Sequence, residues 1–541
     1  MKSRLDPHMP GAALLLLLAM AVLFLPWLGE ILFNSKGEPR EAIVAVSILE
    51  SGNWILPTNY GGDIPFKPPF LAWLMSIFAL VFNGGVVSEY ISRLPSVVAL
   101  MAMVMGGYAW ARRERGTRFA LIFSFVTFLS VEVFRAGIAC RLDMVLTACM
   151  VGGLYVLYGL RRHDCRFKAL RWLGAWALFS CAALTKGPVG SMLPCFAMGI
   201  YALLRGDRFF PTLGKMLGLA LAALLPLAWW FYVAAQQGGQ HFIDLMMEEN
   251  IGRLMGTMSY DSHVQPIYYN FLTILAGMLP WTLAVIMAAF AWRRWNRTAL
   301  TPAGLFSLTV ALTVIVFYCI PESKRSVYLL PAYPFLAYAV ASIFYSGAAV
   351  RPVRAFTWFM AVLAIVAPLA VVALQIWPHP AVVMAPLRWW NYIVLAVPVA
   401  AGTAWIINRH SAVGHVIAIA WAMLLCYIAV VAPAVLNPRS DRRVLDRLTA
   451  DPTAQVLSLE YFYNHRLFTL NYYLDDKIRT VKSFEEAAAY PAGTLLLVSE
   501  RADTTGLGRY FDYEPLLPRS CDHREPIGLA VRRQDNIQQP N

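Results

Sequence analysis

The chain has 541 residues, of which 59% are hydrophobic and only 14% are charged, and its mean hydropathy is +0.55. Soluble domains carry about 25% charged residues, so this composition indicates an integral membrane protein and excludes an ordinary soluble enzyme. The formal net charge is +13, but the excess lies in short loops between apolar runs, which is typical of membrane orientation rather than of nucleic-acid binding. The eight cysteines form no CxxC pair, so the sequence predicts no cysteine metal site.

Apolar runs of membrane-spanning length recur from residue 11 to residue 432. The first run, 11–33, follows a basic start but has no small-residue cleavage site, so we expect a retained span rather than a signal peptide. The alternating pattern of a membrane barrel is missing, which favours helices. The positive-inside rule places the basic loops in the cytoplasm. These loops are 111–118, 161–171, 205–208, 293–297, 351–354 and 408–410.

One apolar run conflicts with that orientation. If 68–83 and 90–110 both crossed the membrane, the basic loop 111–118 would lie outside. We therefore expect 68–83, which begins Lys-Pro-Pro and ends Asn-Gly-Gly, to lie at the outer interface or to re-enter. About thirteen spans remain, and they send the C-terminus outside. They are 11–32, 90–110, 119–134, 141–160, 172–187, 188–204, 213–235, 267–292, 302–320, 327–347, 355–376, 389–407 and 413–432.

The tail from about residue 437 has a different character, because short strand-like runs alternate there with Gly, Asp, Asn and Pro. We expect a transmembrane domain over 1–436, whose outer loops 33–89 and 236–266 cover a site, and a soluble α/β domain over 437–541. The predicted fold class is an all-α polytopic membrane protein with interfacial helices in its first outer loop and a small C-terminal α/β domain.

Charged side chains gather at the outer ends of the spans, where chemistry on a lipid-linked substrate would take place. In the first loop, Glu38 or Glu41 could act as a general base or metal ligand, and Arg40 could bind phosphate. A solvated loop whose charges pair with one another is an equally good interpretation. Pro68 holds Lys67 in extended geometry, away from any helix, and we expect it to bind phosphate at the level of the lipid headgroups. The alternative is an ordinary snorkelling lysine, which composition alone favours slightly.

A second group of charges surrounds the start of the apolar helix near residue 142. Asp143 lies there with Arg135 and Arg141, and an ionisable residue at the edge of a span is a functional candidate. The alternative is a helix-start carboxylate that answers the helix dipole. Lys186, at a break between two spans, is predicted only to snorkel.

Two further outer loops carry candidates. Lys324 and Arg325 lie on the side that the positive-inside rule disfavours, which suggests a phosphate partner. In the loop 236–266, His241 and His263 are weak metal candidates because their spacing fits no motif, and a loop that covers substrate is the better interpretation. The sequence has no P-loop, GxGxxG or GxSxG motif, which argues against a nucleotide-driven enzyme or a serine hydrolase.

Seven segments, in this order, resemble a known family. They are GEPREA, SGNWILPTNYGGDIPFKPPFLAWL, RLPS, RLDM, LTKGPVG, ENIGRLMG and SKRSVYLLPAYP. Over residues 10–335 the chain resembles bacterial membrane glycosyltransferases with the C-type fold, which use polyprenyl-phosphate sugars, and above all the lipid A aminoarabinose transferases and the protein mannosyltransferase-like group. The resemblance implies a multi-pass protein of the bacterial inner membrane with a site that faces the periplasm.

The resemblance also implies roles for individual residues. Glu38 and Asp143 match acidic, catalytic positions. The positions thought to hold the donor phosphate are Lys67, Arg253 and Tyr328. The chain departs from the family pattern at Gly37, where Asp is frequent, and at Phe66, where Glu is frequent. No cofactor is certain, and a divalent metal ion that used the missing Glu is in doubt.

The expected function is transfer of a sugar from a polyprenyl phosphate to lipid A or another periplasmic glycolipid, with inversion at the anomeric carbon. One alternative keeps the enzyme but makes the acceptor a protein Ser or Thr. The alternative from another class is a polytopic lipid or sugar transporter, which would place its polar residues in mid-membrane on broken helices.

Overall fold

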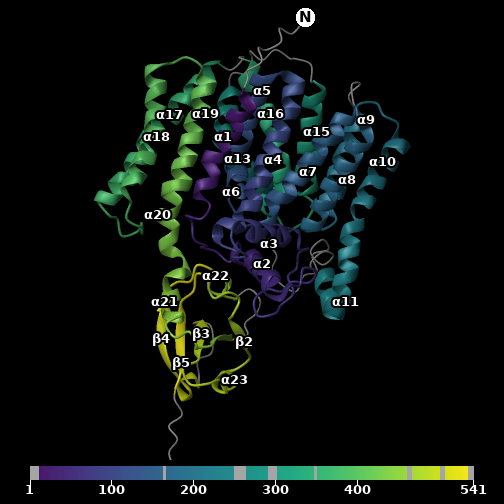
Figure 1. Cartoon of the computed structure of the whole chain (residues 1–541). Coiled ribbons are helices and arrows are strands. Elements are labelled where there is room, and N and C mark those ends of the chain that lie inside the picture. The colour runs from purple at the N-terminus through teal and green to yellow at the C-terminus, as the bar shows by residue number, and fades with distance from the viewer. Residues whose placement is uncertain are drawn as a thin grey trace, which may run out of the picture.

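The computed structural model describes residues 11–161, 166–248, 264–289, 301–346, 350–459, 466–499 and 506–533. A bundle of long helices forms one part of the molecule, and a smaller domain built around a sheet hangs from one end of it (Figure 1). This arrangement confirms the predicted fold class, a helical membrane protein with a small C-terminal α/β domain.

Within the described residues, seven helices are long and apolar enough to cross a membrane, or up to nine if two bent pairs each count as one span. The seven are α4 (Glu89–Arg115), α7 (Leu142–Leu160), α10 with α11 (Phe209–Ala223 and Leu225–Met247), η4 with α16 (Ser326–Ala332 and Tyr333–Ser346), α17 (Val350–Ile376), α18 (Trp389–Ile407) and α19 with its continuation through α20 (Ala412–Cys426 and Ala432–Leu436). The bent pairs are α5 with α6 (Thr117–Phe128 and Val131–Gly137) and α13 with α14 (Tyr269–Gly277 and Trp281–Ala289).

Four more helices complete the bundle: α1 (Ala12–Phe24), α8 (Lys168–Lys186), α9 (Val189–Leu204) and α15 (Pro302–Phe317). Each of the thirteen predicted spans overlaps one of these helices or pairs. Three of the four, α1, α9 and α15, are shorter than 18 residues, so the number of crossings stays a prediction.

Two short helices of the first loop lie across the lower end of the bundle. They are α2 (Pro39–Ser51) and α3 (Phe70–Phe82), and α3 is seen nearly end-on where the bundle helices run vertically (Figure 1). One face of α3 is buried, whereas Val81 and Phe82 are both 65% exposed. An apolar helix with one exposed apolar face fits the expected position at the membrane interface.

The C-terminal domain contains a five-stranded sheet in the order β2-β1-β3-β5-β4. The first three strands of that order are parallel, and β5 and β4 join them in antiparallel pairs. The strands are β1 (Val456–Leu459), β2 (Arg479–Val481), β3 (Leu495–Ser499), β4 (Phe511–Leu517) and β5 (Ile527–Arg532), and the helices are α21 (Leu445–Leu448), α22 (Phe468–Tyr473) and α23 (Phe484–Ala488).

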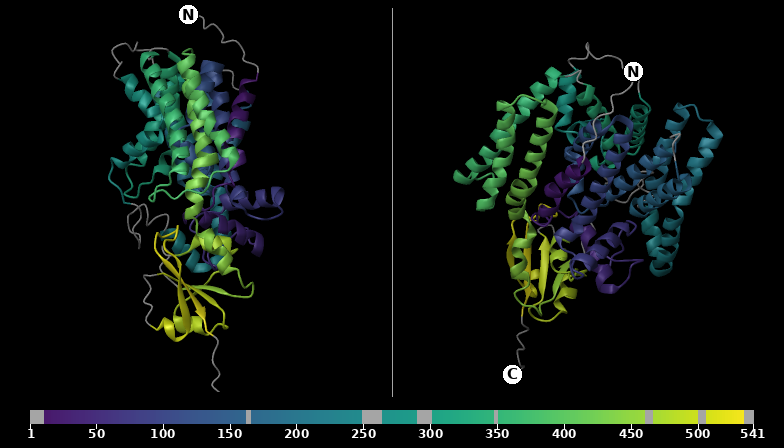
Figure 2. Two further views of the ribbon diagram at one scale, coloured as in Figure 1. Left: turned by 90° about the vertical axis from the view of Figure 1, so that its left-hand side faces the viewer. Right: turned by 45° about the horizontal axis from the view of Figure 1, so that its top comes forward.

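Helix α22 joins this domain to the first loop and to α4. The Tyr472 hydroxyl donates to the carbonyl of Val87 at 2.7 Å, and the Tyr473 hydroxyl donates to the Glu89 carboxylate at 2.9 Å. The side view in Figure 2 shows the sheet directly below the helix ends. The domain therefore contacts the segments that lead into and out of the first loop.

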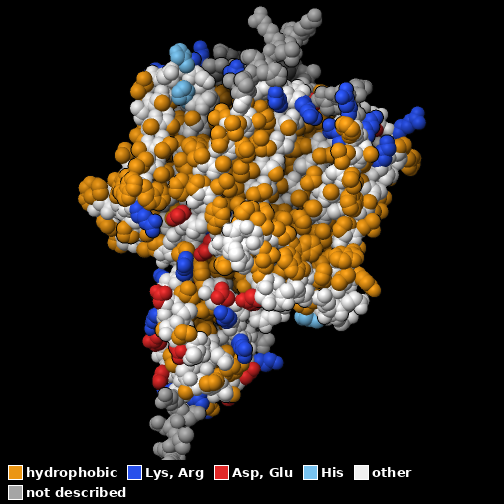
Figure 3. Space-filling model, viewed as in Figure 1, with side chains coloured by type: hydrophobic (Ala, Val, Ile, Leu, Met, Phe, Trp, Pro, Cys, Tyr) orange, Lys and Arg blue, Asp and Glu red, His pale blue; other side chains and the backbone are white. Residues whose placement is uncertain are grey.

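Charged side chains are distributed unevenly over the molecule (Figure 3). Lys and Arg gather at the end of the bundle far from the C-terminal domain, and a broad apolar belt separates the two ends. This agrees with the expectation that the basic loops and the C-terminal domain lie on opposite sides of a membrane.

Candidate functional site

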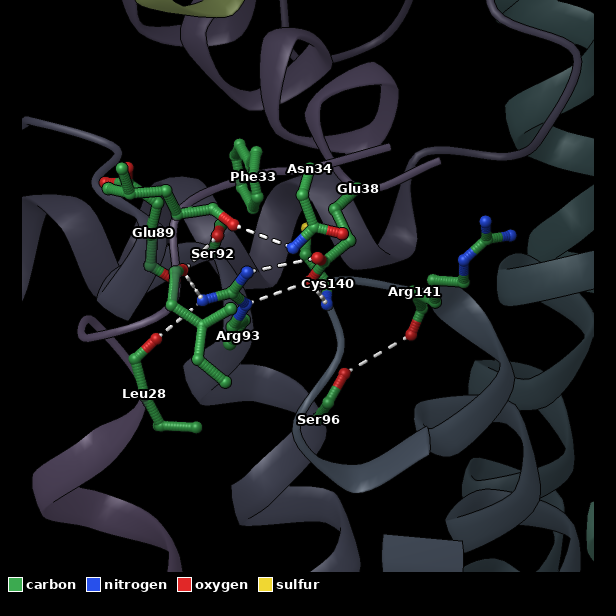
Figure 4. Close-up of polar contacts among 12 residues, drawn as sticks. Leu28, Phe33, Asn34, Glu38, Glu89, Ser92, Arg93, Ser96, Cys140 and Arg141 are labelled. Atoms are coloured by element: carbon green, nitrogen blue, oxygen red, sulfur yellow. Dashed lines mark hydrogen bonds and ion pairs between the residues drawn. The ribbon is translucent and has the colours of Figure 1, made fainter. Parts of the chain in front are cut away.

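Glu38 directly precedes α2, as its N-cap residue, and is enclosed where the first loop meets α4 (Figure 4). Its carboxylate accepts hydrogen bonds from Arg93 Nε at 2.8 Å and Nη2 at 3.0 Å, and from the Cys140 amide at 2.9 Å. Burial would raise the pKa of Glu38, but the Arg93 guanidinium and the Cys140 amide lower it below its usual value. The carboxylate is thus an ionised anchor of the loop.

Arg93 extends this anchor to the end of the first span. Its Nη1 donates to the carbonyl of Leu28 at 2.7 Å and to that of Ile31 at 2.5 Å. The side chain is almost fully buried, and these hydrogen bonds, with the two to Glu38, give it four partner atoms in place of water. A buried arginine needs such partners, because an uncompensated buried charge is strongly destabilising.

Asp143, Lys186 and Tyr328 meet although they come from three separate elements. Lys186 Nζ, at the end of α8, lies 2.5 Å from Asp143 Oδ1, at the start of α7. The same ammonium lies 4.3 Å from the centre of the Tyr328 ring, on η4. Asp143 and Tyr328 are both predicted site residues, whereas Lys186 was predicted only to snorkel at the interface.

A cavity of about 260 Å³ opens beside this group. Its lining residues are Arg135, Arg141, Gln265, Tyr269, Lys324, Arg325, Ser326 and Val327. Arg135 is paired with Glu132, and Lys324 Nζ donates to the Pro321 carbonyl at 2.7 Å. In the part of the chain that the structure describes, no carboxylate lies within 4.0 Å of Arg141 or Arg325.

The guanidinium groups of Arg141 and Arg325 make this cavity cationic. Arg141 is partly buried, and the positive charge of Arg325 lies close enough to repel it. A like-charged pair in a partly buried position is relieved when an anion binds between its members. Arginine is well suited to phosphate, because its planar fork donates two parallel hydrogen bonds.

Gly37 makes room for Arg141. A Cβ atom at residue 37 would lie 1.8 Å from Arg141 Nη2, which is well inside any real contact. The Arg141 side chain points away from the Glu38–Arg93 pair (Figure 4). The departure from the family pattern at Gly37 therefore has a physical consequence: a guanidinium lies against the backbone where a side chain would otherwise stand.

A smaller cavity of about 30 Å³ contains Lys67 together with Arg40, Glu41 and Leu142. Arg40 Nη2 lies 3.1 Å from Glu41 Oε1, so these two first-loop charges pair with each other. Leu142 is the residue between Arg141 and Asp143, so this cavity adjoins the larger one. The fold thus brings Lys67 to the same region as the other candidates.

The remaining candidates are not placed in this group. Arg253 and His263 lie outside the described residues, and His241 is exposed on α11. Among the described residues, no three His, Cys, Asp or Glu side chains are grouped as metal ligands would be. Arg93 and Lys186 already bind the two central carboxylates, so the described residues do not fit a divalent metal ion.

An apolar groove of about 550 Å³ runs from α3 along α4, α7 and α8. Small residues line it on two helices, among them Ala102 and Gly106 of α4 and Ala148 and Gly152 of α7. Phe70 of α3, three residues after Lys67, lies at its start. The groove could hold a hydrocarbon chain whose headgroup lies near the cationic cavities.

The comparisons with known proteins agree with this picture. A family model described as dolichyl-phosphate-mannose-protein mannosyltransferase matches residues 66–232. An undecaprenyl phosphate-alpha-4-amino-4-deoxy-L-arabinose arabinosyl transferase of Proteus mirabilis is 26% identical over 59% of this chain and 57% of its own length. A similar transferase of Yersinia pestis is also 26% identical, over 61% of this chain and 59% of its own length.

Among solved structures, ArnT from Cupriavidus metallidurans bound to undecaprenyl phosphate has a TM-score of 0.75 at 19% identity and covers 98% of this chain and 100% of its own. That likeness shows the fold over nearly the whole chain, whereas the sequence relatives are matched over somewhat more than half of their length. In fold and in sequence together, the chain is similar to ArnT-type membrane glycosyltransferases with the C-type fold.

Proposed function

We propose that the protein transfers a sugar from a polyprenyl phosphate to the phosphate group of a glycolipid such as lipid A, on the periplasmic face of the bacterial inner membrane. The names of the relatives support the donor, and the apolar groove beside Lys67 offers space for its hydrocarbon chain. The basic loops at the opposite end of the bundle support the orientation.

The observation that carries the proposal is the pairing of the charged side chains around the cavity, which among the described residues leaves cations rather than carboxylates to face a substrate. Four of the nearby carboxylates are already bound by a cation: Glu38 by Arg93, Asp143 by Lys186, Glu41 by Arg40 and Glu132 by Arg135. Arg141 and Arg325, in contrast, face the cavity without a carboxylate among the described residues. A hydroxyl acceptor needs a base to remove its proton, whereas an ionised phosphate needs cations and no base.

The chemical step follows from that pairing of charges. The bond from the anomeric carbon to the donor phosphate oxygen breaks, and a bond to an acceptor phosphate oxygen forms on the opposite face, which inverts the centre. The prenyl phosphate leaves with both bonding electrons, and no proton has to move. Fixed cations that face the leaving oxygen stabilise its growing charge in a poorly hydrated cavity.

The proposed roles divide the residues into two sets. Lys67, Arg141 and the Lys186–Tyr328 pair hold phosphate, and Arg253 is assigned to the same set on the resemblance alone. Asp143 fixes the Lys186 ammonium, and Glu38 positions the first loop through Arg93 rather than acting as a base.

The test is an acceptor comparison. Lipid A, other glycolipids and secreted peptides are compared by mass spectrometry in a deletion strain, with and without the wild-type gene or Lys67→Ala. A sugar adduct on a lipid phosphate that only the wild-type gene restores is the expected result. An adduct on peptides would move the assignment to protein O-glycosylation, and no adduct of any kind would favour a transporter.

A further inference from the structure

A second cavity lies at the opposite end of the bundle from the candidate site. Its volume is about 330 Å³, and it is formed by the ends of four helices, α7 to α10. Its lining residues are Leu157, Leu160, Arg161, Lys168, Trp172, Met198, Ala202, Asp207, Thr212, Lys215 and Met216. The sugar-transfer reaction leaves this cavity without a role.

The cavity has an apolar interior and a charged rim. Leu157, Met198 and Ala202 are buried at its base, and Trp172 forms part of the wall. Three cations and one carboxylate stand at the rim, so the rim carries a formal excess of two positive charges: Arg161, Lys168 and Lys215 against Asp207. Arg161 is bound by Asp207 through both nitrogens. In the described part of the chain, neither lysine has a carboxylate within 4.0 Å.

The surroundings of the mouth point to the membrane. Beside it, Phe167 and Leu170 on one side and Phe210 on the other are 77%, 65% and 80% exposed. Lys and Arg side chains gather above the ends of α8, α9 and α10 at the upper right of Figure 3, over the apolar belt. Cations above exposed apolar side chains are the arrangement of a helix end at a bilayer surface.

We propose that this cavity binds the headgroup of an anionic phospholipid. Lys168 and Lys215 would hold the phosphate, and the upper part of one acyl chain would lie against Trp172 and Met216. A free phosphate ion would leave that apolar wall unused, whereas a lipid fills both parts of the cavity. Basic pockets between transmembrane helices are known to suit such headgroups.

A lipid bound in this cavity would also affect the packing of helices α7 and α8. Helices α7 and α8 end at this cavity and carry Asp143 and Lys186 at their other ends. A lipid that holds the near ends together stabilises the packing of the two helices. It is not required for the chemical step, so the inference does not depend on the proposed acceptor.

The test is lipid retention by the purified full-length protein in nanodiscs, measured by native mass spectrometry and thermal unfolding. We expect phosphatidylglycerol to be retained and to raise the melting temperature relative to phosphatidylcholine alone. The double variant Lys168→Gln/Lys215→Gln should retain it at least tenfold more weakly, because both cations that hold the phosphate are removed.

The matched control is Arg351→Gln/Arg354→Gln, which removes two exposed cations from the start of α17. It should retain phosphatidylglycerol as the wild type does. Equal losses in the two double variants would overturn the site, because the effect would then be one of overall charge. Inorganic phosphate that displaces the lipid, or stabilises the protein as well as the lipid does, would overturn the lipid as the ligand.

Discussion

At the scale of single residues, the pairing of Asp143 with Lys186 sets the charge at the centre of the candidate site. Both side chains are largely buried, with 7% and 14% of their surfaces exposed. A buried ion pair adds little net stability, but the loss of one member leaves an uncompensated charge that costs about 3–5 kcal/mol. The pair is therefore better explained by what it presents to a substrate than by stability.

We predict that Lys186→Met lowers the unfolding free energy by about 3–5 kcal/mol and abolishes turnover, because Asp143 stays buried without its partner. The double variant Asp143→Asn/Lys186→Met should recover most of the stability but none of the activity. Thermal unfolding and a donor-hydrolysis or transfer assay measure the two effects. If the double variant is active, the pair has no part in catalysis.

A surface pair is the control for that experiment. Arg447 and Glu514 form an ion pair in the C-terminal domain that is about half exposed on both sides. Arg447→Met should change stability by less than about 1 kcal/mol and leave activity intact.

A substitution at Gly37 tests whether the position of the Arg141 guanidinium matters for transfer, without removing any charge. We predict that Gly37→Ala displaces the Arg141 guanidinium and lowers the transfer rate on the order of 10²-fold, the usual loss when one fixed stabiliser of transition-state charge is removed. Arg141→Ala should cause a similar loss, and the two changes together should be no worse than either alone. The rate of single-turnover transfer measures this.

Gly214→Ala is the matched control for Gly37→Ala. Gly214 lies in α10, and a Cβ there would meet nothing within 4 Å. Full activity in both glycine variants would show that the position of Arg141 is unimportant. The same assay, run with and without a chelator, tests for a divalent metal ion. Because the described residues do not fit such an ion, we expect the transfer rate to be the same in both.

At the scale of elements, a buried acid holds helix α22, which contacts Val87 and Glu89, to the rest of the C-terminal domain. Asp522 accepts hydrogen bonds from the Thr469 amide at 2.8 Å and from the Thr469 hydroxyl at 2.6 Å. Burial raises the pKa of Asp522 to about 7, although the hydrogen bonds from Thr469 oppose the shift. The folded domain therefore binds a proton near neutral pH that the unfolded chain has already released.

The sign of the pH dependence follows directly. Between about pH 4 and pH 7 the folded state holds more protons than the unfolded state, so stability falls as the pH rises, by up to about 1.4 kcal/mol per pH unit for one proton. We predict that the amide hydrogens of α22, corrected for intrinsic exchange, are less protected at pH 8 than below pH 7. The variant Asp522→Asn should remove this difference in protection between the two pH values. Hydrogen–deuterium exchange of wild type and variant, compared at each pH, measures it. An unchanged difference in the variant would assign the effect to another group.

The elements themselves follow closely from the sequence, because apolar length and the positions of basic loops are strong local signals. Helix α3 is the clearest case, since the count of crossings, together with its Lys-Pro-Pro start and Asn-Gly-Gly end, distinguished it from a span. The partners within the site were harder to predict. Arg93 lies 55 residues from Glu38, and Lys186 lies 43 residues from Asp143, and nothing local indicates either pairing. A lone cation inside or between apolar runs was the signal that could have marked both residues as functional.

At the scale of the whole molecule, the two ends of the bundle differ in charge and in what is attached to them. Basic side chains gather at one end, and the C-terminal domain lies at the other (Figure 3). Helix α2, which follows Glu38 of the candidate site, lies at the same end as that domain (Figure 1). A site for a lipid-linked sugar that faces the periplasm requires the C-terminal domain to face the periplasm as well. The orientation can therefore be tested without knowledge of the substrate.

We predict that Lys477→Cys, at a side chain that is 73% exposed in the C-terminal domain, reacts with a membrane-impermeant maleimide in cells whose outer membrane alone has been opened. Arg351→Cys, at the start of α17 on the basic end, should react only after the inner membrane is lysed. The wild-type protein, with its native cysteines, gives the background. The opposite pattern would place the cationic cavities on the cytoplasmic side, where a periplasmic glycolipid could not reach them, and would refute the proposed acceptor together with the orientation.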